Sequence, residues 1–201
     1  MDTKVMFNIG YGLYVLTAKD EKDNGCIINT VMQVTSNPLQ IVIAVNKNCY
    51  TNQIIQKTRK FNISIISEKA DFEIFKHFGF QSGKDVDKFA NYNDVKRSPN
   101  GVLYITEKTN SYISAYVKQE IDLGTHTLFI AQIVAAEHLS DDKTATYEFY
   151  QKCIKPQPEN ATNKKGWVCK ICGYIYEEAN LPADFICPIC KHGASDFERI
   201  A

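Results

Sequence analysis

Four cysteines near the carboxyl end of the chain have the spacing of a metal site. Cys169 and Cys172 form one Cys-x-x-Cys pair and Cys187 and Cys190 form another, with fourteen residues between the pairs. Four thiolates with this spacing can surround one ion tetrahedrally. The spacing alone is compatible with zinc or iron, because tetrahedral sulfur suits both metals.

The residues near these cysteines favour iron. Five aromatic residues stand close to the pairs: Trp167, Tyr174, Tyr176, Phe185 and Phe197. Aromatic side chains exclude water from a redox centre. From Lys164 onward the charges balance at five of each sign, whereas a zinc ribbon that binds nucleic acid would more often carry excess Lys and Arg. A unit of about 35 residues has too small a core, so the metal should supply much of its stability.

The composition is that of an ordinary globular protein with no membrane or nucleic-acid partner. Hydrophobic residues make up 44% of 201 positions, and 23 basic residues balance 23 acidic ones. The sequence shows no signal peptide and no apolar run of eighteen residues, which predicts a cytoplasmic protein. Seven cysteines, an odd number, fit a reducing compartment. Cys26, Cys49 and Cys153 follow no pattern and are expected to be buried or idle thiols.

The elements that must position these residues are mainly strands. Alternating or β-branched apolar runs predict strands at residues 12–17, 26–28, 39–45, 61–66, 102–106, 111–121 and 127–134. Asn24-Gly25 predicts a hairpin turn, and residues 29–37 read as a polar loop. Helices are expected at 51–60, capped by Thr51, and at 71–77 and 86–90. Many strands with few helices predict a mainly β fold, a closed barrel.

The chain is expected to divide into two domains. Residues 1–151 form the large one and residues 166–201 the metal-binding one. Residues 152–165 contain two prolines, many polar side chains and little to bury, which is typical of a linker.

Two polar segments of the large domain are candidate binding sites. Residues 29–38 carry hydroxyl and amide groups that could hold a heterocycle and a phosphate tail. At residues 46–51 a strand ends and a helix begins beside Lys47, which favours phosphate. Either segment could also be a solvated turn. The chain has no GxGxxG motif and no P-loop, which argues against a Rossmann-type site.

Residues 167–176, 182–190 and 195–198 resemble a rubredoxin, a one-electron carrier, and the spacing between the pairs is closer to the rubredoxin-like domain of rubrerythrins. The resemblance implies one iron held by Cys169, Cys172, Cys187 and Cys190.

Residues 29–38, 46–51, 61–64, 82–89 and 124–130 together resemble the flavin reductase family, whose split β-barrel binds FMN. The resemblance implies that the isoalloxazine is lined by Asn29, Thr30, Gln33, Val34 and Thr35. The residues implied to hold the ribityl and phosphate groups are Ser36, Asn46, Lys47, Tyr50 and Thr51, with Lys88 a further phosphate candidate. His126 matches a position close to flavin and nicotinamide, although it could instead be a histidine satisfied by its neighbours.

The order of the two modules resembles the high-molecular-weight rubredoxins. This resemblance implies a protein that passes electrons from NAD(P)H through FMN to iron, and then to a partner such as a flavodiiron protein reducing oxygen or nitric oxide. The resemblance to split-barrel flavin reductases implies a homodimer. Two alternatives remain open. The flavin domain could accept electrons from another protein, as in a flavoredoxin, or the four cysteines could hold a structural zinc used for docking.

Overall fold

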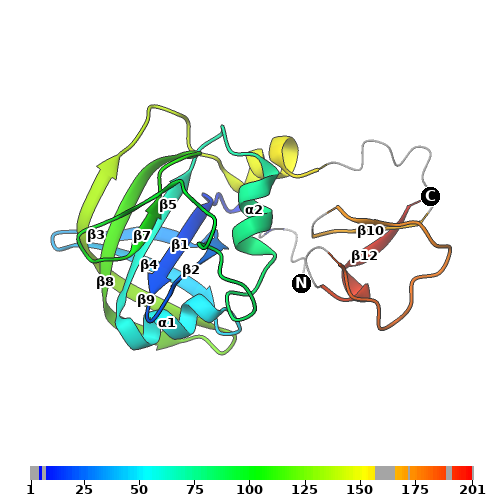
Figure 1. Ribbon diagram of the computed structural model, residues 1–201, viewed down its shortest axis with the longest axis horizontal. Helices are drawn as coiled ribbons and strands as arrows, with labels where there is room; N and C mark the ends of the chain where they lie inside the picture. Colours follow the sequence, from blue (N-terminus) through cyan, green and yellow to red (C-terminus); the bar gives the residue numbers. More distant parts are fainter. Residues whose placement is uncertain (1–4, 6–7, 157–165, 172, 189–191, 201) are drawn as a thin grey trace.

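A seven-stranded antiparallel sheet forms the large domain of the computed structural model, which describes residues 5, 8–156, 166–171, 173–188 and 192–200. The strands are β1 Tyr14–Lys19, β2 Asp23–Ile28, β3 Val31–Ser36, β4 Leu39–Asn46, β5 Lys60–Ile66, β8 Thr109–Asp122 and β9 His126–His138. They pair in the order β2-β1-β5-β8-β9-β4-β3. Figure 1 shows the sheet curling strongly around its interior. The predicted mainly β fold is confirmed; among the described strands, β2 and β3 are the two edges.

The curled sheet encloses one apolar core. Alternate residues of the strands point inward, so that Ile41, Ile43 and Val45 of β4 are all buried. Helix α1, Tyr50–Thr58, covers one end and buries Ile54 and Ile55 against the strands. Each such aliphatic side chain contributes roughly 1.5–3 kcal/mol relative to an exposed one. This core holds the ends of β4 and α1 in place.

A second apolar cluster lies beneath helix α2, Phe72–Gly79, which Asp71 precedes as N-cap. Phe75 and Phe78 of α2 pack in this cluster with Val15 and Leu13. The predicted hairpin joins β1 and β2, but its turn lies at residues 20–22, and Asn24 and Gly25 pair with β1 inside β2. A Cβ at Gly25 would lie 3.1 Å from the Phe78 ring, so glycine at this position lets α2 pack closely against β2.

Four other features differ from the sequence expectations. The polar segment 29–37 contains the edge strand β3, because backbone pairing with β4 outweighs its polar composition. Helix α1 ends at Thr58, Arg59 is left-handed and Lys60 starts β5. The N-cap of α1 is Cys49, not Thr51, which lies buried inside the helix. The expected helix at residues 86–90 is a series of turns.

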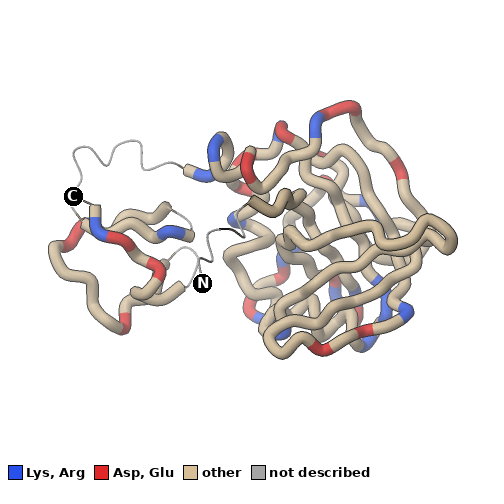
Figure 2. The backbone as a smooth tube through the Cα atoms, turned by 180° about the vertical axis from the view of Figure 1, so that it is seen from behind, with Lys and Arg blue, Asp and Glu red and all other residues tan. Residues whose placement is uncertain are grey.

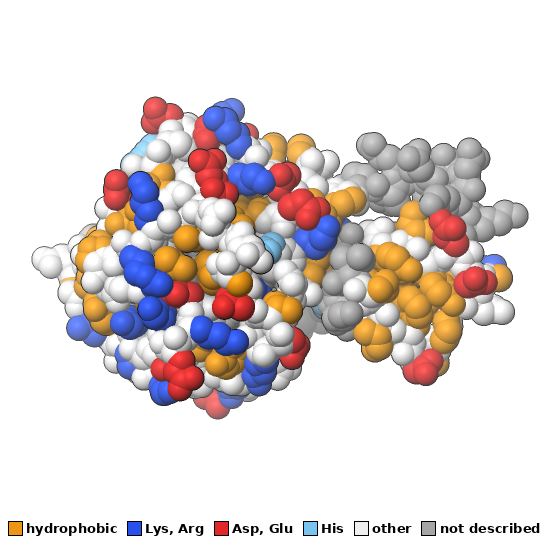
Figure 3. Space-filling view, in the orientation of Figure 1, with side chains coloured by type: hydrophobic (Ala, Val, Ile, Leu, Met, Phe, Trp, Pro, Cys, Tyr) orange, Lys and Arg blue, Asp and Glu red, His pale blue; other side chains and the backbone are white. Residues whose placement is uncertain are grey.

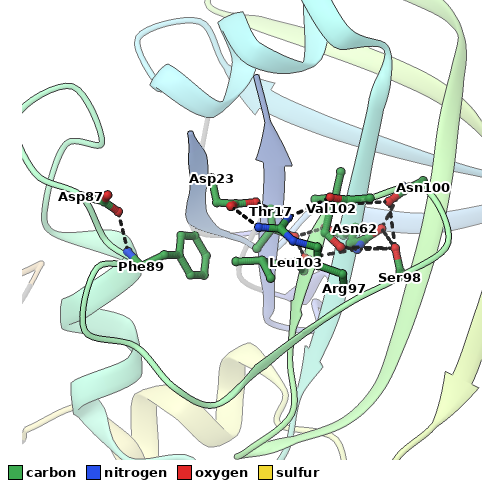
Figure 4. A network of polar contacts seen from close by, with 11 residues as sticks. Thr17, Asp23, Asn62, Asp87, Phe89, Arg97, Ser98, Asn100, Val102 and Leu103 are labelled. Atoms are coloured by element: carbon green, nitrogen blue, oxygen red, sulfur yellow. Dashed lines mark hydrogen bonds and ion pairs between the residues drawn. The ribbon is translucent and has the colours of Figure 1, made fainter. Parts of the chain in front are cut away.

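A short hairpin, β6 Val95–Arg97 with β7 Leu103–Ile105, is tied to β5 by a buried polar network (Figure 4). Asn62 Nδ2 donates to Val102 O at 2.8 Å and to Ser98 Oγ at 2.9 Å. Asn100 Nδ2 donates a hydrogen bond to Asn62 Oδ1 at 3.0 Å. The network satisfies the backbone of a loop that would otherwise bury unpaired carbonyls.

The chain then reaches the small domain. Helix α3, Tyr147–Phe149, and a π-helical turn, Tyr150–Ile154, end the large domain. Strands β10 Gly166–Cys169, β11 Ile175–Tyr176 and β12 Phe197–Ile200 form the small sheet, with a 3-10 turn at Ala194–Asp196. Figure 2 shows acidic and basic residues interspersed on both domains. Among the described residues, no helix has the length and apolar character needed to cross a membrane.

Candidate functional site

A polar cavity of about 510 Å³ opens at the amino end of α1. It is lined by Asn24, Cys26, Ile27, Asn46, Asn48, Cys49, Tyr50, Thr51, residues 78–83 and Lys88. Four predicted site residues, Asn46, Tyr50, Thr51 and Lys88, therefore meet there although they come from separate segments. The volume lies within the roughly 300–1,000 Å³ typical of small-molecule sites.

Asn24 and Gly83 shape the wall of this cavity, and sequence reasoning gave Asn24 no role. Asn24 Nδ2 donates to the buried Thr51 Oγ1 at 2.9 Å. A Cβ at position 83 would lie 1.9 Å from Asn24 Oδ1, so only glycine allows this approach. The packing fixes the Thr51 hydroxyl at the amino end of α1.

Lys88 supplies a buried positive charge. Its Nζ donates to Gly25 O at 2.8 Å and to Phe78 O at 2.9 Å, and burial lowers the pKa of its ammonium group. An ammonium has three N–H groups, so these two bonds leave one that can reach an anion in the cavity. A cation, a hydroxyl and a helix amino terminus together fit the phosphate of a cofactor.

Cys26 and Cys49 also meet in the cavity wall. Cys49 is the N-cap of α1 and Cys26 lies on β2. The hydrogen bond from the Cys26 side chain lowers the pKa of Cys49 to about 6, with further lowering from Thr51 and the Lys88 charge against an opposing effect of burial. The sequence predicted idle thiols, since no spacing rule relates residues on different elements.

A second group of predicted residues lies where β4 ends and β9 begins. Asn46 pairs with His126 across the two strands. The Lys47 amide donates to Thr125 O at 3.0 Å, and Lys47 Nζ lies 2.5 Å from an oxygen of Asp122. His126 Nδ1 is 2.9 Å from Thr125 Oγ1. This contact agrees with the alternative that His126 is a histidine satisfied by its neighbours. Asn46 joins this group to the cavity.

The residues predicted to line the isoalloxazine are not among those that line the cavity. Gln33, Val34 and Thr35 are exposed on the edge strand β3, as is Ser36, which was predicted to hold the ribityl and phosphate groups. Asn29 and Thr30 precede Val31, which pairs with Ile43, so the antiparallel register carries them toward the Asn46 end of β4. Thr35 and Ser36 pair with Gln40 and Leu39 instead, at the opposite end of β4.

The described half of the metal site is buried in aromatic surroundings. Cys169 and Cys187 are 1% and 0% exposed and pack with Phe197 in a cluster that also contacts Trp167, Tyr174, Tyr176 and Phe185. Cys172 and Cys190 lie outside the described residues. Gly173, directly after the first pair, has φ +79°, in the left-handed region that favours glycine. Two buried thiols in a water-poor cluster fit a thiolate-bound metal.

Phe80 connects the two regions. It lines the polar cavity and also packs against the apolar cluster around Cys169 and Cys187. Pro188 of the second cysteine pair faces the same residue across a neighbouring pocket. Phe80 therefore contacts both the cavity and the thiol cluster.

The chain matches two family models along its length. Residues 6–156 match the flavin reductase like domain, and residues 167–198 match the rubrerythrin, rubredoxin-like domain. A high molecular weight rubredoxin of Moorella thermoacetica is 33% identical over the full length of both chains. An NAD(P)H ferric-chelate reductase of Archaeoglobus fulgidus is 35% identical over 81% of this chain and 96% of its own.

Solved structures share the fold of the large domain. An NADH:FAD oxidoreductase of Streptomyces globisporus has a TM-score of 0.64 at 19% identity, covering 71% of this chain and 84% of its own. A flavoredoxin of Methanosarcina acetivorans has a TM-score of 0.59 at 21% identity, covering 68% and 75%. The flavin reductase-like domain implies a bound flavin, and the rubredoxin-like domain implies iron. The chain belongs to the family of high-molecular-weight rubredoxins, electron-transferring oxidoreductases with a flavin reductase-like domain ahead of a rubredoxin-like one.

Proposed function

We propose that this NAD(P)H-dependent oxidoreductase holds FMN in the large domain and delivers electrons through iron in the small domain to a partner protein. The position of Phe80 carries the proposal, because this residue contacts both the polar cavity and the cluster around Cys169 and Cys187. A bound flavin accepts two electrons as a hydride and can release them one at a time to iron. The covalent link between the domains raises the effective concentration of the acceptor.

The cavity residues would bind the polar tail of FMN. Lys88 and the amino end of α1 would attract the phosphate, and the Thr51 hydroxyl would donate to it. Asn46 would hold the ribityl chain at the cavity mouth. The ring would then lie along Asn29, Thr30 and the β3 residues, with His126 close to the bound nicotinamide.

A homodimer would cover the exposed ring site. Met32, Val34 and Leu39 of the β3–β4 hairpin are 61%, 41% and 42% exposed. An edge strand with three exposed apolar side chains is a surface that another chain can pair with and bury. A second copy would complete the site that one chain leaves open to water.

The partner would dock on the small domain. Iron would be held by Cys169, Cys172, Cys187 and Cys190, with Ile186, 55% exposed, directly beside Cys187. Figure 3 shows apolar side chains gathered on the visible face of this domain. An exposed apolar surface beside a redox centre suits brief contact with a carrier such as a flavodiiron protein.

Anaerobic mixing with NADH or NADPH tests the electron path. The flavin absorption should bleach first and the iron absorption second, while Cys172→Ser should remove only the second phase. Phe80→Ala should slow the second phase, and Phe72→Ala is the matched control, since Phe72 packs against the same cluster without lining the cavity. If NADH and NADPH leave the flavin oxidised and only another reduced protein reduces it, the result would support the flavoredoxin-like alternative. Zinc on metal analysis would contradict the iron assignment.

A further inference from the structure

Cys26 and Cys49 form a thiol pair that the electron path does not use. They lie 23 residues apart in sequence, on β2 and at the start of α1, yet their side chains hydrogen-bond to each other. Both line the polar cavity, so a small solute can reach them when no cofactor fills it. Neither belongs to the Cys-x-x-Cys pairs.

The surroundings give the two sulfurs different chemical characters. The ionisable groups facing Cys49 are the Cys26 thiol and the Lys88 ammonium, and the pKa of Cys49 falls to about 6. The pKa of Cys26 is raised by its hydrogen bond to Cys49 and by burial. Since Asn24 donates to Thr51 Oγ1, the Thr51 hydroxyl keeps its one proton for another acceptor, which is the Cys49 sulfur when no phosphate is bound. Cys49 is therefore the thiolate and Cys26 the proton donor.

We propose that Cys49 and Cys26 are a peroxide-reactive dithiol, with Cys49 as the attacking sulfur and Cys26 as the resolving sulfur. The Cys49 thiolate attacks one oxygen of a hydroperoxide, the O–O bond breaks, and the leaving oxygen takes a proton to become water or an alcohol. Cys49 is then a sulfenic acid. The Cys26 sulfur attacks it, the S–O bond breaks, and the hydroxyl leaves as water with the Cys26 proton. Two thiols and one hydroperoxide give a disulfide, with two electrons moved from sulfur to oxygen.

The proximity of Cys26, rather than the acidity of Cys49, distinguishes this site from a surface thiol. At pH 7 a thiol with a pKa near 6 is mostly thiolate, but its nucleophilicity is lower, so the net rate gain over an ordinary thiol is only about two- to threefold. Cys153 is exposed and does not line the cavity. Cys49, by contrast, shares the cavity wall with Cys26, which can resolve a sulfenic acid formed there.

The test is peptide mapping of the purified full chain after one equivalent of hydrogen peroxide. Trypsin cuts after Lys22, Lys47 and Lys57, which places Cys26 and Cys49 on separate peptides, 23–47 and 48–57. The expected product is these two peptides joined, lighter by two hydrogen atoms than their sum and separated again by dithiothreitol. The rate should fall about tenfold per pH unit below pH 6, where the thiolate is protonated.

Variants assign the two roles. Cys26→Ser should trap a dimedone-reactive sulfenic acid on peptide 48–57, and Cys49→Ser should leave peptide 23–47 unmodified. Cys153→Ser is the control and should form the linked peptides at the wild-type rate. The proposal is overturned if peroxide modifies Cys153 while peptides 23–47 and 48–57 stay unlinked. It is also overturned if Cys49→Ser moves the sulfenic acid to Cys26. These experiments measure peptide masses, so their outcome does not depend on whether the protein oxidises NAD(P)H.

Discussion

Gly83 comes so close to Asn24 that no side chain fits between them. Gly83→Ala would place a Cβ 1.9 Å from Asn24 Oδ1, so Asn24 must move and lose its hydrogen bond to Thr51. Loss of one buried hydrogen bond costs about 1–3 kcal/mol of unfolding free energy. If Thr51 helps to hold the cofactor phosphate, the affinity for FMN should fall by about tenfold, which corresponds to about 1.4 kcal/mol.

Flavin fluorescence titration and urea denaturation measure the two effects of this substitution. Gly193→Ala is the matched control, because its Cβ would meet no atom within 4 Å and its φ is −80°. Unchanged FMN affinity in Gly83→Ala, together with lower stability, would remove Asn24 and Thr51 from the proposed cofactor site.

At the scale of elements, the β6–β7 hairpin depends on one side chain of β5. Asn62 is fully buried and bonds to Ser98, Asn100 and Val102. Asn62→Ala would leave several buried polar groups without partners, so the free energy of unfolding should fall by about 3 kcal/mol. Urea denaturation followed by circular dichroism measures the change.

The exposed Asn91 supplies the control for this prediction. Asn91→Ala should change the unfolding free energy by less than about 0.5 kcal/mol, as surface substitutions usually do. A similarly small effect of Asn62→Ala would mean that the hairpin holds its position by apolar packing of Leu103 and Ile105 instead.

At the scale of the whole molecule, the two domains should differ in their dependence on metal. The small sheet has three short strands and a small buried cluster, so removing the metal should unfold it. The large domain has its own cores and should keep its unfolding transition. After chelation at mildly acidic pH, the NMR signals of the large domain should therefore stay dispersed, whereas those of Trp167 and Tyr176 should lose their dispersion. Retention of the small-domain signals without metal would contradict this prediction.

The proposed dimer is also a property of the whole molecule. Met32→Glu would place a charge in the exposed hairpin surface and should shift the protein from dimer to monomer in sedimentation velocity. Ile186→Glu is the control, since this exposed apolar residue lies on the small domain. A wild-type chain that sediments as a monomer at all concentrations would refute the homodimer and its role in covering the flavin ring.

The sequence by itself determined those features that depend on local spacing. Two Cys-x-x-Cys pairs and the apolar alternation of β4 and β5 each act within a few residues, so short-range rules were sufficient. The expected turn at Asn24-Gly25 was misplaced, because both residues pair with β1 and the glycine fits against Phe78 of α2, a contact that no local pattern shows.

Only the tertiary structure decided which distant residues meet. Asn24 reaches Thr51, Lys88 reaches carbonyls of β2 and α2, and Cys26 reaches Cys49. None of these contacts has a sequence signature, because each depends on how the curled sheet and its two helices pack. The same packing brings Phe80 against both the cavity and the cluster around Cys169 and Cys187, since burial of apolar surface brings elements together without regard to their separation along the chain.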